Sequence, residues 1–120
     1  MIVKLALISG LSVVGTLARF GLSSLFPSPW ATFAVNAVGC FLIGLVGALA
    51  QAHRISDDAR TIVFVGFLGA LTTFSSFAWE TLTLERNGQV GLAFINVGAQ
   101  VIVGLALVYA GYAIVPRPSP

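Results

Sequence analysis

Charged residues are scarce in this sequence. Only 8% of its 120 residues are Asp, Glu, Lys or Arg, whereas 58% are hydrophobic. Soluble domains carry about 25% charged residues, so most of the surface of this protein must face something other than water. The formal net charge is only +2, and no basic patch is interleaved with aromatic residues, which argues against nucleic acid as a partner.

Residues that commonly serve in catalysis or metal binding are also few. Cys40 is the only cysteine and His53 the only histidine, so neither a disulfide within the chain nor a zinc site is expected. Cys40 lies in an apolar run, where it is interpreted as a small core residue. No Asp, Glu or His falls at the middle of an apolar run, and Glu80 comes nearest. Proton-coupled transporters normally need a central carboxylate, so passive permeation is favoured over catalysis and over proton coupling.

Four apolar runs are long enough to cross a bilayer as helices, which takes about 20 residues. They extend approximately over Ile2–Leu25, Trp30–Ala50, Thr61–Leu84 and Gly88–Val115. Ser56, followed by two aspartates, is expected to begin a helix ahead of the third run. Because unpaired backbone groups are costly in lipid, every run is predicted to be helical. The sequence therefore predicts one all-α integral membrane domain over residues 1–120.

The basic residues in the links give only a weak indication of orientation. With four spans, both termini lie on the same side as the second link. That side carries Lys4, Arg54, Arg60 and Arg117, and the other side carries Arg19 and Arg86. Such a small difference under the positive-inside rule fits a chain that inserts in both orientations. It fits equally well a chain that inserts one way, with both termini inside.

Polar side chains inside the spans mark sites of function or of helix association, since they are costly in lipid. Arg19 either snorkels to the headgroups, pairs with Glu80 or anchors an aqueous entrance. The amide of Asn36 either joins helices or donates N–H groups to an anion. Asn96 and Gln100 lie one turn apart on the fourth span, and they either join helices or line a pore.

The third span carries an unusual cluster of hydroxyl and aromatic residues near mid-membrane. The cluster is GALTTFSSF, residues 69–77. Hydroxyl side chains that bond backbone carbonyls can bend or open a helix. Broken helices at mid-depth are tolerated where they line a cavity or an ion site. The cluster therefore favours a broken third helix with a functional role over a continuous helix whose hydroxyls bond their own backbone.

Three segments of the chain resemble the small fluoride channels, also called fluoride exporters or the camphor-resistance family. They are GTLARF (15–20), TFAVNAVGCF (32–41) and GFLGALTTFSSF (66–77), the last followed by Glu80. The resemblance covers essentially the whole chain. It implies a fluoride-selective channel of the inner (plasma) membrane that passively exports cytoplasmic fluoride. It also implies an antiparallel, dual-topology dimer with two narrow pores.

The resemblance further implies roles for individual residues. It places five side chains along the fluoride path: Asn36, Phe74, Phe77, Ser75 and Thr32. The hydroxyl of Thr73 is a further candidate donor there. The backbone carbonyls of Gly69 and Thr72, from both subunits, would cage a structural Na⁺, and Arg19 would lie near the vestibule. Asn96 and Gln100 stand where well-known members carry Tyr and Ser, so the polar track on the fourth span departs from the family pattern.

Uncharged donors suit a small, strongly hydrated anion. Amide N–H groups and hydroxyl O–H groups can replace the water around such an ion, and the partly positive edges of phenyl rings can help them. These neutral groups do not hold the ion too tightly for it to leave. Two other classes compete with this reading. A small four-helix multidrug transporter requires a carboxylate in the first span, which this chain lacks. A subunit that does not conduct by itself, such as one half of a heterodimer with a paralogous chain, remains an alternative to a homodimer.

Overall fold

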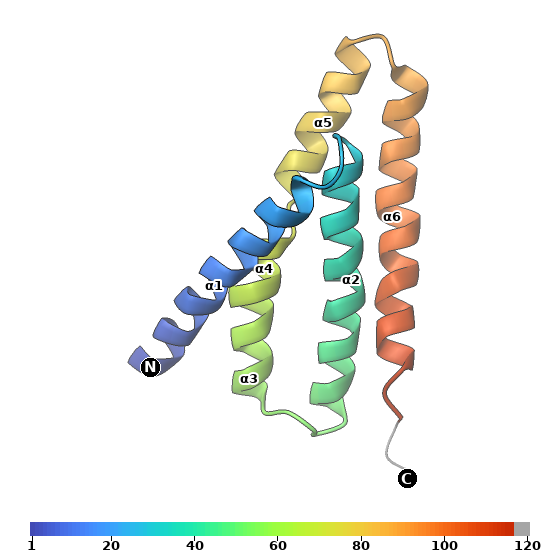
Figure 1. The fold of residues 1–120 in the computed structure, drawn as a ribbon. Coiled ribbons are helices and arrows are strands. Elements are labelled where there is room, and N and C mark those ends of the chain that lie inside the picture. Colours follow the sequence, from blue (N-terminus) through green and yellow to red (C-terminus); the bar gives the residue numbers. More distant parts are fainter. Residues whose placement is uncertain (117–120) are drawn as a thin grey trace.

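The computed structural model describes residues 1–116, and the secondary structure of this part of the chain is entirely helical (Figure 1). Arg117, which the charge count above includes, lies outside the described residues. The elements are α1 (Ile2–Ser23), α2 (Trp30–Gln51), α3 (Asp57–Thr61), the π-helical segment η1 (Ile62–Leu68), α4 (Gly69–Leu71), α5 (Phe74–Arg86) and α6 (Val90–Ala113).

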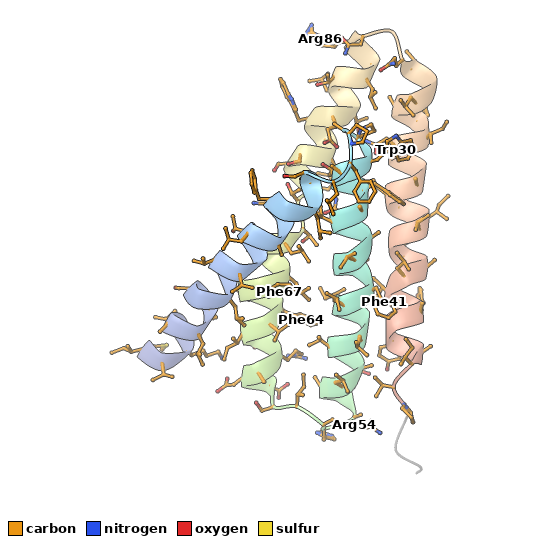
Figure 2. All side chains as sticks on the ribbon, viewed as in Figure 1. Trp30, Phe41, Arg54, Phe64, Phe67 and Arg86 are labelled. Carbon is orange, nitrogen blue, oxygen red and sulfur yellow. The ribbon has the colours of Figure 1, made fainter. Side chains whose placement is uncertain are left out.

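All four predicted spans are confirmed as helices long and apolar enough to cross a membrane. The third is the stretch from α3 to α5, and it begins earlier than predicted, at Asp57. Its start is capped as expected, because the hydroxyl of Ser56 accepts a hydrogen bond from the amide of Ala59 at 3.1 Å. Figure 2 shows Arg54 and Arg86 at opposite ends of the bundle. The chain is therefore a multi-pass membrane protein, consistent with the predicted location in the inner membrane.

The third span is interrupted between α4 and α5. Thr72 (φ −84°, ψ 157°) and Thr73 (φ −152°, ψ 111°) both have extended backbone. The half ahead of the break is itself irregular, since it contains the seven-residue π-helical segment η1. Figure 1 shows α5 leaving the break in a different direction from α3 and α4. The predicted broken third helix is thus confirmed.

Helices α2 and α6 form the most extensive pair in the fold and run along each other (Figure 1). Two glycines face the partner helix at close range. A Cβ atom on Gly44 would lie 2.1 Å from the carbonyl oxygen of Val108, and one on Gly111 would lie 2.1 Å from that of Phe41. Neither position can therefore carry a side chain without separating the helices. This is the close backbone approach by which small residues join helices in lipid.

Helix α1 crosses the first half of the third span at an angle (Figure 1). Glycine contacts again set the distance, because a Cβ on Gly15 would lie 2.4 Å from the carbonyl oxygen of Phe67. Near the start of both segments, Nζ of Lys4 lies 2.6 Å from Oδ1 of Asp58. Apart from Gly15, no residue of α1 is buried. Much of the surface of this helix is therefore left for lipid or for another chain.

Candidate ion site at the helix break

The break in the third span is held by the side chain of Asn36, which projects from α2. Oδ1 of Asn36 accepts the backbone N–H of Thr73 at 2.8 Å, and Nδ2 of Asn36 donates to the carbonyl oxygen of the same residue at 3.2 Å. Thr73 directly precedes α5, so its N–H has no helical acceptor and needs a partner from elsewhere in an apolar surrounding, whereas its carbonyl accepts the first hydrogen bond of α5. The amide of Asn36 supplies the acceptor for this N–H and a further donor to the carbonyl, and so stabilises the extended conformation.

The break diverts two hydrogen bonds that a continuous helix would contain. In such a helix the N–H of Thr73 would bond the carbonyl of Gly69, but it donates to Asn36 instead. The N–H of Ser76 would bond the carbonyl of Thr72, but it donates to Oγ1 of Thr73, which caps α5. The carbonyls of Gly69 and Thr72 thus both lose their regular helical donors.

An open cavity of about 370 Å³ lies at the break. Its walls come from α2, the first half of the third span, α5 and α6. The residues that line it are Asn36, Gly39, Cys40, Ile43, Phe64, Leu68, Gly69, Thr72, Thr73, Phe74, Phe77, Gln100 and Val101. No residue in this set carries a formal charge. Phe74 and Phe77 meet edge to face, with ring centroids 5.4 Å apart and planes at 65°.

A second polar cluster surrounds Glu80, two turns along α5 from the break. Oε1 of Glu80 accepts hydrogen bonds from the hydroxyls of Thr32 at 2.6 Å and Ser28 at 2.9 Å. Oε2 is buried and has no hydrogen-bond partner among the described residues. Thr32 is itself only 5% exposed. Both hydroxyls are therefore committed to the carboxyl group.

The two amides of α6 reach different parts of the fold. Nδ2 of Asn96 donates to the hydroxyl of Thr81 on α5 at 3.0 Å, and Asn96 is only 3% exposed. Oε1 of Gln100 accepts from Nδ2 of Asn36 at 3.1 Å. Asn96 therefore joins α6 to α5, as the helix-joining alternative predicts, whereas Gln100 joins α6 to the residue that holds the break.

The structure brings most of the predicted site residues together. Asn36, Thr73, Phe74 and Phe77 line one cavity with the two residues whose carbonyls are predicted to hold Na⁺. Ser75 is exposed next to this cavity, with its hydroxyl 3.3 Å from that of Thr73. Their roles in ion binding stay predictions.

Besides Ser75, two predicted residues lie outside the lining of the cavity. Thr32 contacts Glu80. Arg19 is half-buried, and it takes part in neither of the salt bridges found within residues 1–116, which join Lys4 to Asp58 and Arg60 to Asp57. The suggested pairing of Arg19 with Glu80 is therefore not made within this part of the chain.

Sequence reasoning missed two members of these networks. Ser28 lies between two prolines in the link that precedes α2, and it donates to Glu80. Gln100 was noticed, but its direct contact with Asn36 was not predicted. No local pattern identifies either contact, because the partners are 52 and 64 residues apart in the chain.

These features define a class of membrane protein: a four-span bundle whose third helix is broken over an uncharged polar and aromatic cavity. The chain belongs to the family of CrcB-like, camphor resistance (CrcB) proteins, whose model matches residues 6–112.

Curated relatives share this similarity over nearly their whole length, and each of those compared is named a fluoride-specific ion channel, FluC. The protein from Stutzerimonas stutzeri is 45% identical over 109 residues, which cover 85% of this chain and 88% of the relative. Those from Methylobacillus flagellatus and Nitrosococcus oceani are each 42% identical, over 112 and 118 residues. These alignments cover 85% and 92% of this chain, and 86% and 94% of the two relatives.

Proposed function

We propose that this protein is a fluoride-selective ion channel that lets cytoplasmic fluoride leave the cell passively across the inner membrane. One observation carries the proposal: the third helix is broken between Thr72 and Thr73, and the break opens onto a cavity lined by uncharged donors and phenyl rings. The names of the relatives, which are fluoride-specific ion channels, support the same function.

The chemistry of the cavity suits a small anion. Phe74 and Phe77 can turn their rings so that the partly positive edges face an ion. The hydroxyl of Ser75 can donate to it, and that of Thr73 can do so if it gives up its donation to Oγ of Ser76 at 3.0 Å. Because these groups are neutral, they bind an anion less tightly than an ammonium group would, which allows release as well as entry. A larger halide such as chloride loses less hydration energy but does not fit a narrow bore.

The pore of this proposal requires a second chain. Phe74 is 78% exposed on the single chain, and Gly69 and Ser75 are exposed beside it. Exposure of this magnitude at the predicted ion path fits a homodimer in which the partner covers the break. The small difference in basic residues between the two sides is compatible with two copies inserted in opposite orientations. A two-fold axis would then pass near Gly69.

The carbonyls of Gly69 and Thr72 fit a Na⁺ at that axis. Both have lost their regular helical donors, and both residues line the cavity. Neutral carbonyl oxygens are suitable ligands for hard cations. When bound, Na⁺ would supply a fixed positive charge between the two pores. Asn36 would act on this site indirectly, because its contact with Thr73 is what keeps the Gly69 carbonyl available.

Efflux from liposomes tests the proposed function. The purified chain would be reconstituted in vesicles loaded with potassium fluoride, and release would be followed with a fluoride electrode after valinomycin is added. Rapid fluoride release without chloride release is expected. Absence of fluoride release from the chain alone, restored by a paralogous chain, would instead indicate one half of a heterodimer. Proton movement driven by a drug gradient would indicate a multidrug transporter.

A further inference from the structure

The cavity at the break contains a further amide donor, Nε2 of Gln100, whose orientation depends on the hydrogen bonds of Asn36. The primary amide of Asn36 carries two hydrogens. One is donated to the carbonyl of Thr73 at 3.2 Å, and the other to Oε1 of Gln100 at 3.1 Å. The N–H groups of Asn36 are therefore both engaged within the protein and are not free for an ion.

The orientation of Gln100 follows from that of Asn36. The backbone of Thr73 fixes Asn36, because its N–H can face only the amide oxygen and its carbonyl only the amide nitrogen. Nδ2 of Asn36 consequently points at Gln100, and only the amide oxygen of Gln100 can accept this hydrogen bond. A flipped Gln100 amide would place two donors against each other. Nε2 of Gln100 is thereby directed away from Asn36.

This nitrogen has no visible partner. Nε2 of Gln100 is buried, and no atom of the described residues accepts a hydrogen bond from it. Buried donors without an acceptor are rare in folded proteins, and each calls for an explanation such as a ligand. Gln100 also lines the cavity at the break, together with Asn36, Phe74 and Phe77. The site thus contains a polar group that an anion would satisfy.

We propose that Nε2 of Gln100 donates a hydrogen bond to fluoride in this cavity, so that Gln100 rather than Asn36 supplies the amide donor of the path. The inference rests on the proposed channel function. Nε2 is covered in the single chain, and contact with the ion requires the amide to tilt. The terminal torsion of Gln is broad, so a tilt can occur while Oε1 keeps its bond to Asn36.

Two substitutions separate donation to the ion from support of Asn36. Gln100→Met keeps the approximate length of the side chain and removes both polar groups. Gln100→Glu keeps an oxygen facing Asn36. It has a spare donor only when the carboxyl group is protonated. Asn96→Leu is the matched control, because Asn96 lies one turn away on α6 and its amide is committed to Thr81.

The measurement is fluoride current from reconstituted protein as a function of fluoride concentration, at pH 8 and at pH 5.5, with thermal unfolding of the same samples in detergent. For Gln100→Met we expect the half-saturating fluoride concentration to rise about tenfold, which corresponds to the loss of one hydrogen bond to an ion. For Gln100→Glu we expect a raised half-saturating fluoride concentration at pH 8, which falls toward the wild-type value at pH 5.5. For Asn96→Leu we expect a lower unfolding temperature with unchanged half-saturation.

The outcomes distinguish the inference from the function on which it rests. If the wild type conducts fluoride and Gln100→Met saturates like the wild type, the inference is wrong and the channel function stands. A wild-type half-saturating concentration for Gln100→Glu at both pH values would show that Gln100 only accepts the hydrogen bond of Asn36 and does not bind the ion. If the half-saturating concentration rose equally in Asn96→Leu, the effect would be due to altered packing of α6. If Gln100→Met does not fold, the two pH values compared in Gln100→Glu decide. No fluoride current from the wild type would overturn both proposals.

Discussion

Asn36 bonds both backbone groups of Thr73, accepting its N–H at 2.8 Å and donating to its carbonyl at 3.2 Å. Asn36 lies in α2 and Thr73 lies at the break in the third span, so the side chain of one provides hydrogen bonds to the backbone of the other across the two spans. This contact directs the Thr73 N–H away from the Gly69 carbonyl. The amide of Asn36 therefore both stabilises the break in the third span and keeps the Gly69 carbonyl free of its helical donor.

Replacing that amide with a carboxylate tests the link. In Asn36→Asp, the backbone N–H of Thr73 keeps its acceptor, but Oε1 of Gln100 loses its donor and the carbonyl of Thr73 loses the donor that Asn36 adds to it. An unpaired buried polar group costs about 1–3 kcal/mol, and a negative charge would also repel an anion. We expect fluoride efflux from liposomes to fall about 100-fold or more, since every 1.4 kcal/mol is a factor of about ten.

Asn36→Leu serves as the comparison for this variant, because it removes the two bonds that Asn36 donates, and also the acceptor of the Thr73 N–H, without adding charge. A smaller loss of efflux in Asn36→Leu than in Asn36→Asp would separate repulsion from the structural effect. Wild-type efflux in Asn36→Asp would show that the residue only joins helices and has no influence on the ion path.

The phenylalanine pair makes a second prediction. Phe74→Ile and Phe77→Ile each remove a ring edge from the cavity while keeping an apolar side chain. We expect both variants to fold, with elution and unfolding temperature like the wild type, and to lose fluoride efflux. Phe94→Ile is the matched control, because Phe94 is 75% exposed on α6 and does not line this cavity. Full efflux in either cavity variant would remove that ring from the proposed path.

The spans and the break could be predicted because both depend on local sequence. A bilayer requires long apolar helices. The prolines and charged residues that separate the four apolar runs locate the ends of these helices within a few residues. The paired threonines at 72 and 73 are followed by an aromatic and hydroxyl run, so the sequence itself contains the capping hydroxyl that begins α5. Such signals act over one or two turns and need no knowledge of the fold.

The partners of the buried polar groups could not be predicted, because they come from distant helices. Asn36 could be recognised as costly in lipid, but not as bonded to Thr73 and Gln100, 37 and 64 residues away. Ser28 donates to Glu80, which follows it by 52 residues. For Arg19, three alternatives were open, and one of them, pairing with Glu80, is not made within residues 1–116, where neither salt bridge includes Arg19.

The proposed Na⁺ site can be tested at Gly69. A Cβ there would have only the carbonyl oxygen of Phe64 nearby, at 3.4 Å, so the protomer can accept a side chain. In the proposed dimer the same side chain would fill the space at the axis. We therefore expect Gly69→Val to retain its helical circular dichroism while losing Na⁺ content, measured by elemental analysis, and dimer mass. Gly91→Val, with open space around it, is the control. A normal dimer containing Na⁺ would exclude Gly69 from the site.

The space for the break itself depends on Gly39. A Cβ on Gly39 would lie 2.1 Å from Cγ2 of Thr72, far inside van der Waals contact. Thr72 cannot simply rotate away, because its hydroxyl donates to the carbonyl of Leu68 at 2.9 Å. Gly39→Ala should therefore destabilise the fold by about 1–3 kcal/mol, seen as a lower unfolding temperature. Gly10→Ala, with nothing within 4 Å, should cause no such loss. Equal unfolding temperatures for the two variants would mean that α2 does not limit the position of Thr72.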